Sequence, residues 1–214
     1  MFETMKAAIF DMDGTMIDSM MEWRKLNAEF VRSKGIVPTP EEEEEMLSMS
    51  GTMVVSYFKE HFGLEADFES LCLEACRRME PVYRAGVPFK PGIEAYLRRL
   101  KARGVKCVVA TATPARLALI ALNRMGLVPE LDFIYSIDMI GLDKGDPAFF
   151  DTLCGLIGEK KEDCVMFEDS LYAMKSAKRA GLGVVGITDP TNEKDRAAIR
   201  ENCSVLIDSF DELD

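Results

Sequence analysis

Short, almost continuous apolar runs alternate along the chain with longer segments in which apolar residues recur every three or four positions. The first pattern is typical of buried strands, and the second is typical of helices with one buried face. Strands are predicted at 6–10, 105–110, 133–137, 163–167 and 183–187, and helices at 92–103, 114–125, 147–156, 171–180 and 193–200. This alternation predicts an α/β fold, a doubly wound parallel-sheet (Rossmann-like) core with helices on both faces.

Residues 18–86 interrupt that alternation. They contain no convincing strand, but helical patterns cover 18–34, 41–49, 52–62 and 68–84. The second of these begins with a capping box in which Thr39 and Glu42 flank Pro40. We therefore expect an α-helical cap domain, residues 18–87, inserted into a catalytic core made of residues 1–17 and 88–214.

The amino-acid composition limits the partners and the kinds of catalytic site that the protein can have. The chain of 214 residues carries 26 basic and 37 acidic side chains, for a net charge of -11, which argues against a nucleic acid or an anionic membrane as its main partner. A single histidine, His61, excludes zinc sites built on several histidines. We therefore expect catalysis by carboxylates. No signal-peptide segment and no cysteine framework is visible, which favours a cytoplasmic protein with reduced thiols.

The segment that follows the first predicted strand carries two acidic residues in a tight turn. Asp11 ends the strand, Asp13 comes two residues later, and Gly14 allows the chain to turn sharply. Ligands of open parallel sheets bind beyond the carboxyl ends of the strands, so both carboxylates are expected in a binding site. Alone, the motif is also compatible with a turn that caps its own backbone.

Three further strand ends carry polar groups. Thr111 and Ala112 precede a helix, where backbone N–H groups bind phosphate oxygens, although a threonine there is also a common helix cap. Lys144 lies in a loop, where most lysines are simply solvated. Glu168 and Asp169 offer hard oxygen ligands or an ordinary cap. Because all four groups lie at strand ends of one sheet, a single site is the better interpretation.

This order of residues resembles the haloacid dehalogenase-like (HAD) superfamily. Its pattern of DxDGT, then Ser or Thr, then Lys, then two acids matches Asp11 to Thr15, Thr111, Lys144 and the pair Glu168–Asp169. The resemblance covers nearly the whole chain, and residues 144–150 and 168–181 look like the β-phosphoglucomutase-like branch. Ala112 stands where many members have asparagine, which leaves recognition there to the backbone N–H.

The resemblance implies phosphoryl transfer through an aspartyl-phosphate. Asp11 is then the nucleophile and Asp13 the general acid and base, with Mg²⁺ as the cofactor. The implied metal ligands are the Asp11 carboxylate, the Asp13 carbonyl and Asp169, with Glu168 nearby or acting through water. Thr111, Ala112 and Lys144 are the implied phosphate-binding residues.

Residues at a few positions distinguish between the reactions known in this family. Family dehalogenases lack an acid where Asp13 stands, so a phosphatase acting on a small phosphorylated metabolite, such as a sugar phosphate, is the leading hypothesis. A sugar phosphomutase of the β-phosphoglucomutase type is the alternative. It has a histidine where Trp23 aligns and an arginine after Gly51, where this chain has Thr52 and Met53. Arg116 could supply the positive charge that a mutase needs, so the mutase stays an alternative.

A third hypothesis is a protein that binds a phosphometabolite without turnover. The complete set of catalytic side chains argues against it. Substrate contacts in the cap are expected from Trp23, Gly51 and Thr52, with one or two of the methionines at 20, 21, 46, 49 and 53. The resemblance also leads us to expect a monomer with a mobile cap.

Overall fold

The computed structural model describes residues 4–47, 49, 51–65 and 67–213. Six parallel strands form one sheet in the order β3-β2-β1-β4-β5-β6. The strands are β1 (Ala7–Phe10), β2 (Lys106–Thr111), β3 (Phe133–Ser136), β4 (Cys164–Glu168), β5 (Gly183–Ile187) and β6 (Val205–Ile207). The doubly wound sheet that the sequence predicts is thereby confirmed.

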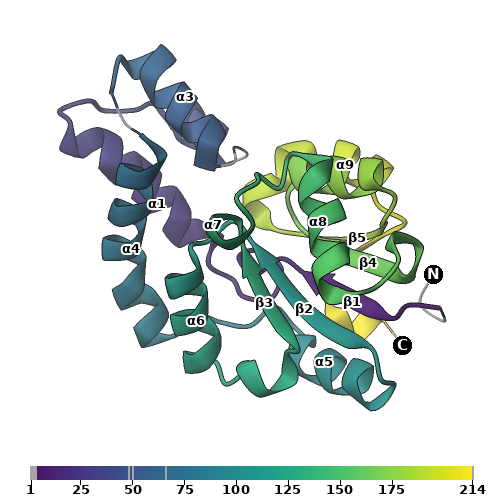
Figure 1. The fold of residues 1–214 in the computed structure, drawn as a ribbon. Coiled ribbons are helices and arrows are strands. Elements are labelled where there is room, and N and C mark those ends of the chain that lie inside the picture. The colour runs from purple at the N-terminus through teal and green to yellow at the C-terminus, as the bar shows by residue number, and fades with distance from the viewer. Residues whose placement is uncertain (1–3, 48, 50, 66, 214) are drawn as a thin grey trace.

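Helices cover both faces of the sheet (Figure 1). One face packs on α5 (Ile93–Ala102) and α6 (Ala115–Arg124), and the other on α8 (Pro147–Ile157), α9 (Leu171–Ala180) and α10 (Arg196–Asn202). The short α7 (Ile137–Ile140) follows β3. In the described part of the chain, no helix is long and apolar enough to cross a membrane.

β1 lies at the centre of the sheet because all four of its side chains are apolar and fully buried. Ala8 and Phe10 point to the α5–α6 side, and Ala7 and Ile9 to the other, as the alternation of a strand requires. Phe10 pairs with Phe167 of β4, with their ring centroids 4.6 Å apart. The residues that follow these two neighbouring strands therefore meet at one edge of the sheet.

The helical insertion consists of α1 (Met20–Ser33), α2 (Pro40–Leu47), α3 (Gly51–Phe62) and α4 (Phe68–Ala85). These helices lie to one side of the sheet, and α4 packs against α6 (Figure 1). They have a separate small core, in which the rings of Phe30 and Phe58 stack at 5.1 Å. The expected capping box is present, since Thr39 and Glu42 each accept the other's backbone N–H. The domain boundaries at 17/18 and 87/88 stay a prediction.

The two connections between insertion and sheet lie against each other. Ile17 and Phe89 form an antiparallel bridge, and the N–H of Asp18 donates to the carbonyl of Pro88 at 2.9 Å. The ammonium of Lys90 is buried and lies 2.7 Å from the carboxylate of Asp189, which follows β5. This ion pair fastens the second connection to the core.

Three elements differ from the sequence prediction. β6 and α7 were not predicted, because each has three or four residues, too few to show a periodicity. The helix expected over 193–200 is divided into the 3₁₀ helix η3 (Pro190–Asp195) and α10. Asp189 begins η3 by accepting the N–H of Thr191 at 2.9 Å.

Candidate active site

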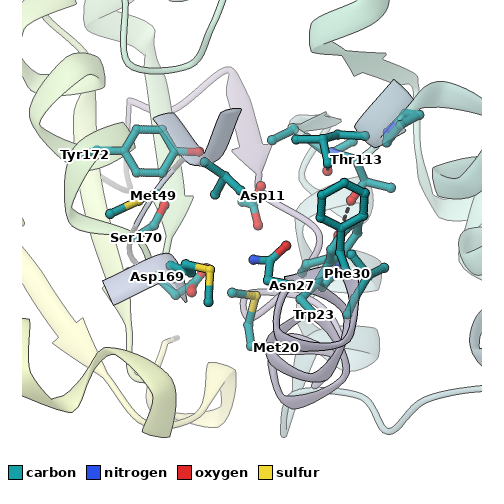
Figure 2. A pocket seen from close by; sticks show the side chains of 18 of the residues that line it. Asp11, Met20, Trp23, Asn27, Phe30, Met49, Thr113, Asp169, Ser170 and Tyr172 are labelled. Carbon is teal, nitrogen blue, oxygen red and sulfur yellow. Dashed lines mark hydrogen bonds between the residues drawn. The ribbon is translucent and has the colours of Figure 1, made fainter. Parts of the chain in front are cut away.

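A cavity of about 180 Å³ lies between the carboxyl ends of the strands and the four inserted helices. Its core side is formed by the segments that follow β1, β2 and β4, and its other side by α1 to α4 with the connection between α2 and α3. Figure 2 shows Asp11 pointing into the space between these two sides. The core residues that line it are Asp11, Asp13, Thr111, Ala112, Thr113, Pro114, Glu168, Asp169, Ser170 and Tyr172.

Lys144 joins two acidic residues at the floor of this cavity. Its Nζ lies 2.6 Å from Oδ1 of Asp11 and 2.7 Å from Oε2 of Glu168, and all three side chains are nearly inaccessible to solvent. Burial raises the pKa of Asp11 to about 8, with Lys144 opposing the shift and Glu168 and Asp13 adding to it. Burial alone would lower the pKa of Lys144, but Asp11 and Glu168 raise it overall, so the lysine stays charged.

Asp169 completes an acidic cluster with Asp11 and Glu168. One oxygen from each of these side chains lies within 4.8 Å of the others. The carboxylate of Asp169 accepts the hydroxyl of Thr15 at 3.0 Å and the amide of Asn192 at 2.8 Å. Burial, followed by the charges of Glu168 and Asp11, raises the pKa of Asp169 well above its usual value. When all three carboxylates are ionised, the single ammonium of Lys144 leaves two negative charges uncompensated in this cluster.

Asp13 is held by three hydroxyl groups. Thr113 donates to Oδ2 at 2.6 Å, while Tyr83 donates to Oδ1 at 2.5 Å and Ser19 donates to the same oxygen. Tyr83 is fully buried on α4, so its bond comes from the helical insertion. The indole N–H of Trp23 in turn donates to the Tyr83 hydroxyl at 3.1 Å. Asp13 is therefore fixed in orientation by both parts of the molecule.

The strand end of β2 presents hydrogen-bond donors to the same cavity. The Oγ1 of Thr111 accepts the N–H of Thr113 at 3.0 Å, which leaves the Thr111 hydroxyl proton free to donate. Ala112 lies in the turn between them and lines the cavity without a polar side chain. The turn precedes the first residues of α6, where the helix dipole favours a negatively charged group.

Some of the insertion residues that are predicted to contact substrate line the cavity. Trp23 lines the cavity, together with three of the methionines, Met20, Met46 and Met49, rather than one or two. Gly51 and Thr52 begin α3, and how they face the site lies outside the described part of the structure. Arg116 does not line the cavity, because its guanidinium pairs with Glu80 at 2.8 Å.

Sequence reasoning missed most of the groups that hold the acidic residues. Tyr83 and Asn192 are 70 and 23 residues away from the side chains that they contact, and no local motif marks them. Thr113 lies in the same short segment as Thr111, so it was the one such residue that the motif could have indicated. Asn27, which turns its amide towards Asp11 in Figure 2, carries no sequence signal either.

Solved structures share this architecture over almost the whole chain. The CbbY protein from Rhodobacter sphaeroides, in complex with phosphate, superposes with a TM-score of 0.84 at 24% identity, covering 98% of this chain and 96% of that one. A putative β-phosphoglucomutase from Thermotoga maritima superposes with a TM-score of 0.70 at 25% identity, over 95% and 94% of the two chains.

Curated relatives and a family model agree with the geometry. The validoxylamine A 7'-phosphate phosphatase of Streptomyces hygroscopicus subsp. limoneus is 30% identical over 186 residues, 86% of this chain and 85% of that protein. The phosphorylated carbohydrates phosphatase of Thermotoga maritima is 25% identical over 190 residues, 88% of each. The family model for haloacid dehalogenase-like hydrolases matches residues 5–181. The chain therefore belongs to the haloacid dehalogenase-like hydrolase family and groups with its phosphatases.

Proposed function

We propose that this phosphoric monoester hydrolase acts on a small phosphorylated metabolite, that it requires Mg²⁺, and that Asp11 carries the phosphoryl group between two half-reactions. The observation that carries the proposal is the placement of Asp11 and Asp13 beside each other in one cavity, with Lys144, Glu168 and Asp169 around them. The names of the curated relatives, which include phosphatases of phosphorylated carbohydrates and of hexitols, support a sugar-like substrate.

The donor set fits Mg²⁺. Asp11, Glu168 and Asp169 offer hard oxygen atoms close to one another, which is the ligand type that this ion prefers. The two uncompensated negative charges of the cluster match the charge of a divalent cation. We propose Asp11, Asp169 and the backbone carbonyl of Asp13 as ligands, with Glu168 nearby. When bound, the ion supplies charge that offsets the repulsion between the phosphate ester and the carboxylates.

The first half-reaction transfers the phosphoryl group to the enzyme. A carboxylate oxygen of Asp11 forms a bond to phosphorus while the bond between phosphorus and the ester oxygen breaks. Asp13 donates its proton to that ester oxygen, so the alcohol leaves uncharged. Thr111 and the backbone N–H groups before α6 hold the remaining phosphoryl oxygens, together with Lys144.

The second half-reaction releases phosphate. Asp13, now ionised, takes a proton from a water molecule that attacks phosphorus, and the bond to Asp11 breaks. Thr113, Tyr83 and Ser19 fix Asp13 for both proton transfers, because their hydroxyls hold its two oxygens in one orientation. The products are the alcohol and inorganic phosphate, and both carboxylates return to their starting state.

A phosphomutase is the less favoured function. An intramolecular mutase has to bind a second phosphate while the first is on Asp11, which requires a further cation in the cavity. The residue that the sequence offered for this, Arg116, pairs with Glu80 and does not line the cavity.

The test measures phosphate release from an aryl phosphate with Mg²⁺ present. We expect steady turnover that stops with EDTA, and a decrease of about 10⁴-fold or more in kcat for Asp11→Asn, since the amide is not a nucleophile. Asp151→Asn, which changes a surface carboxylate paired with Lys161, is the matched control and keeps full activity. Undiminished turnover by Asp11→Asn would exclude Asp11 as the nucleophile. Conversion of hexose 1-phosphate to 6-phosphate without phosphate release would instead establish the mutase.

A further inference from the structure

The wall of the cavity that faces Asp11 from the insertion is apolar. Eight aliphatic or aromatic side chains form it, and four of them are 7% exposed or less. Because Phe30, Met46 and Val54 also belong to the small core of the insertion, packing fixes their positions. The eight residues are Met20, Trp23, Leu26, Phe30, Met46, Met49, Val54 and Leu71.

Few polar groups interrupt this wall. The indole N–H of Trp23 is already bonded to Tyr83, which leaves the amide of Asn27 and the carboxylate of Glu74. Arg77 donates to Glu74 at 2.7 Å and Arg78 also donates to it, and these bonds lower the pKa of Glu74 to about 2. The wall therefore offers an amide and an ionised carboxylate to a bound molecule.

Basic side chains are missing from the described part of this wall. Among the lining residues that the structure describes there is no lysine, arginine or histidine. The segment 47–52, which is described only in part, contains no basic residue in its sequence either. Arg78 is bonded to both Glu74 and Glu29, and Lys144 is bonded to Asp11 and Glu168. A second anionic group on the substrate would thus lose its hydration without finding a counter-ion, which is strongly unfavourable.

We propose that this cavity selects phosphate monoesters of an uncharged cyclic alcohol that turns an apolar face to α1 and α4 and carries no second phosphate or carboxylate. The proposal rests on the phosphatase function above and names its substrate class. The volume agrees, because a closed cavity of about 150 Å³ holds benzene, and the volume of about 180 Å³ here accommodates one small ring. Asn27 is placed to bind a hydroxyl group of that ring.

The first experiment compares kcat/KM, by phosphate release with Mg²⁺, for four esters. They are benzyl phosphate, glucose 6-phosphate, phosphoglycolate and fructose 1,6-bisphosphate. We expect benzyl phosphate to exceed glucose 6-phosphate by about tenfold, and the two esters with a second anion to fall about 100-fold or more below benzyl phosphate. Equal values, or a preference for either doubly anionic ester, would overturn the proposal while leaving the phosphatase function intact.

A pair of variants on α4 tests the wall directly. Leu71 lines the cavity, whereas Leu73 is 66% exposed on the same helix. Leu71→Lys places an ammonium group in the wall, so we expect kcat/KM for phosphoglycolate relative to benzyl phosphate to rise about tenfold or more. Leu73→Lys adds the same charge outside the cavity and leaves that ratio unchanged. The same ratio in both variants would show that the wall does not select against anions.

A binding measurement separates this proposal from the phosphatase function. Trp23 is the single tryptophan of the chain and lines the cavity, so its fluorescence reports on occupation. With Asp11→Asn, which prevents turnover, we expect a saturable change with benzyl alcohol that Leu71→Lys weakens and Leu73→Lys does not. If no ester is hydrolysed but this binding pattern is seen, the phosphatase function fails and the cavity assignment stands. Absence of the pattern overturns the cavity assignment whatever the activity.

Discussion

Gly14 shows at the scale of one residue why the acidic motif needs a glycine. Its φ of +83° lies in the left-handed region, which strains any other residue. A Cβ atom there would also lie 2.5 Å from Oδ2 of Asp169 and 2.8 Å from Cγ of Met20. The turn after β1 therefore passes so close to the acidic cluster that only a hydrogen atom fits.

A comparison of Gly14→Ala with Gly104→Ala separates the effect of this close contact from the effect of backbone strain. Gly104 has a similar φ of +74°, but a Cβ atom there would meet no atom of the described residues within 4 Å. We expect Gly104→Ala to lower the free energy of unfolding by about 1–2 kcal/mol without changing kcat. Gly14→Ala should cost more, and kcat should fall because Asp169 has to move. Denaturant unfolding and phosphate release measure both effects, and equal results for the two variants would contradict the contact argument.

At the scale of elements, α4 connects the insertion to the chemistry. It carries Leu71 and Glu74 in the cavity wall, and its last turns carry the Tyr83 hydroxyl that donates to Asp13. The helix is also tied to α6, since Glu80 pairs with Arg116 and the carbonyl of Arg84 accepts from Arg124. One element therefore contributes both to the cavity wall and to the orientation of Asp13, the proposed general acid.

Tyr83→Phe tests this orienting role of α4. It removes one hydrogen bond that orients the Asp13 carboxyl group, so we expect kcat to fall by about ten- to a hundredfold while KM changes by less than about twofold. The matched control is Tyr57→Phe, which removes the 2.9 Å bond to Glu45 on the surface of the insertion and leaves kcat unchanged. A rise in KM with constant kcat would show that Tyr83 acts on substrate binding rather than on Asp13.

At the scale of the whole molecule, the excess of acidic residues is divided between the surface and the buried active site. Much of the net charge of -11 lies on exposed side chains, but Asp11, Glu168 and Asp169 are buried around a single ammonium group. Burying like charges destabilises a fold unless a counter-charge is present. The free energy of unfolding therefore depends on whether a cation is bound at the active site.

Mg²⁺ should stabilise the whole protein for this reason. At about 100 times its Kd we expect the ion to raise Tm by about 5–10 °C, and EDTA to reverse the change. Asp169→Asn should raise the Tm of the metal-free protein, because it removes a carboxyl group whose pKa burial raises and which therefore destabilises the fold near neutral pH. It should also abolish most of the increase with Mg²⁺. Asp151→Asn on the surface of α8 should keep that increase. An unchanged Mg²⁺ effect in Asp169→Asn would place the ion elsewhere.

Most strands could be predicted from their apolar runs, and most helices from their periodicity. β1 is four apolar residues directly before an aspartate, and α9 was predicted with its observed ends. β6 could not be predicted, since it has three residues and two of them are only half-buried. The same limit applies to the site: Asp11, Thr111, Lys144 and Asp169 end or follow strands that periodicity reveals, whereas Tyr83 and Asn192 act across long stretches of chain.

The sequence by itself determined the layered α/β architecture and the acidic motif, because apolar periodicity and strand-end chemistry are local properties of a chain. Only the tertiary structure decided how those groups are held and what they face. Asp13 is oriented by hydroxyls from three separate segments, and the cavity wall combines side chains from α1 to α4 with the connection between α2 and α3. Such contacts depend on how elements pack in three dimensions, and neighbours along the chain do not specify that packing.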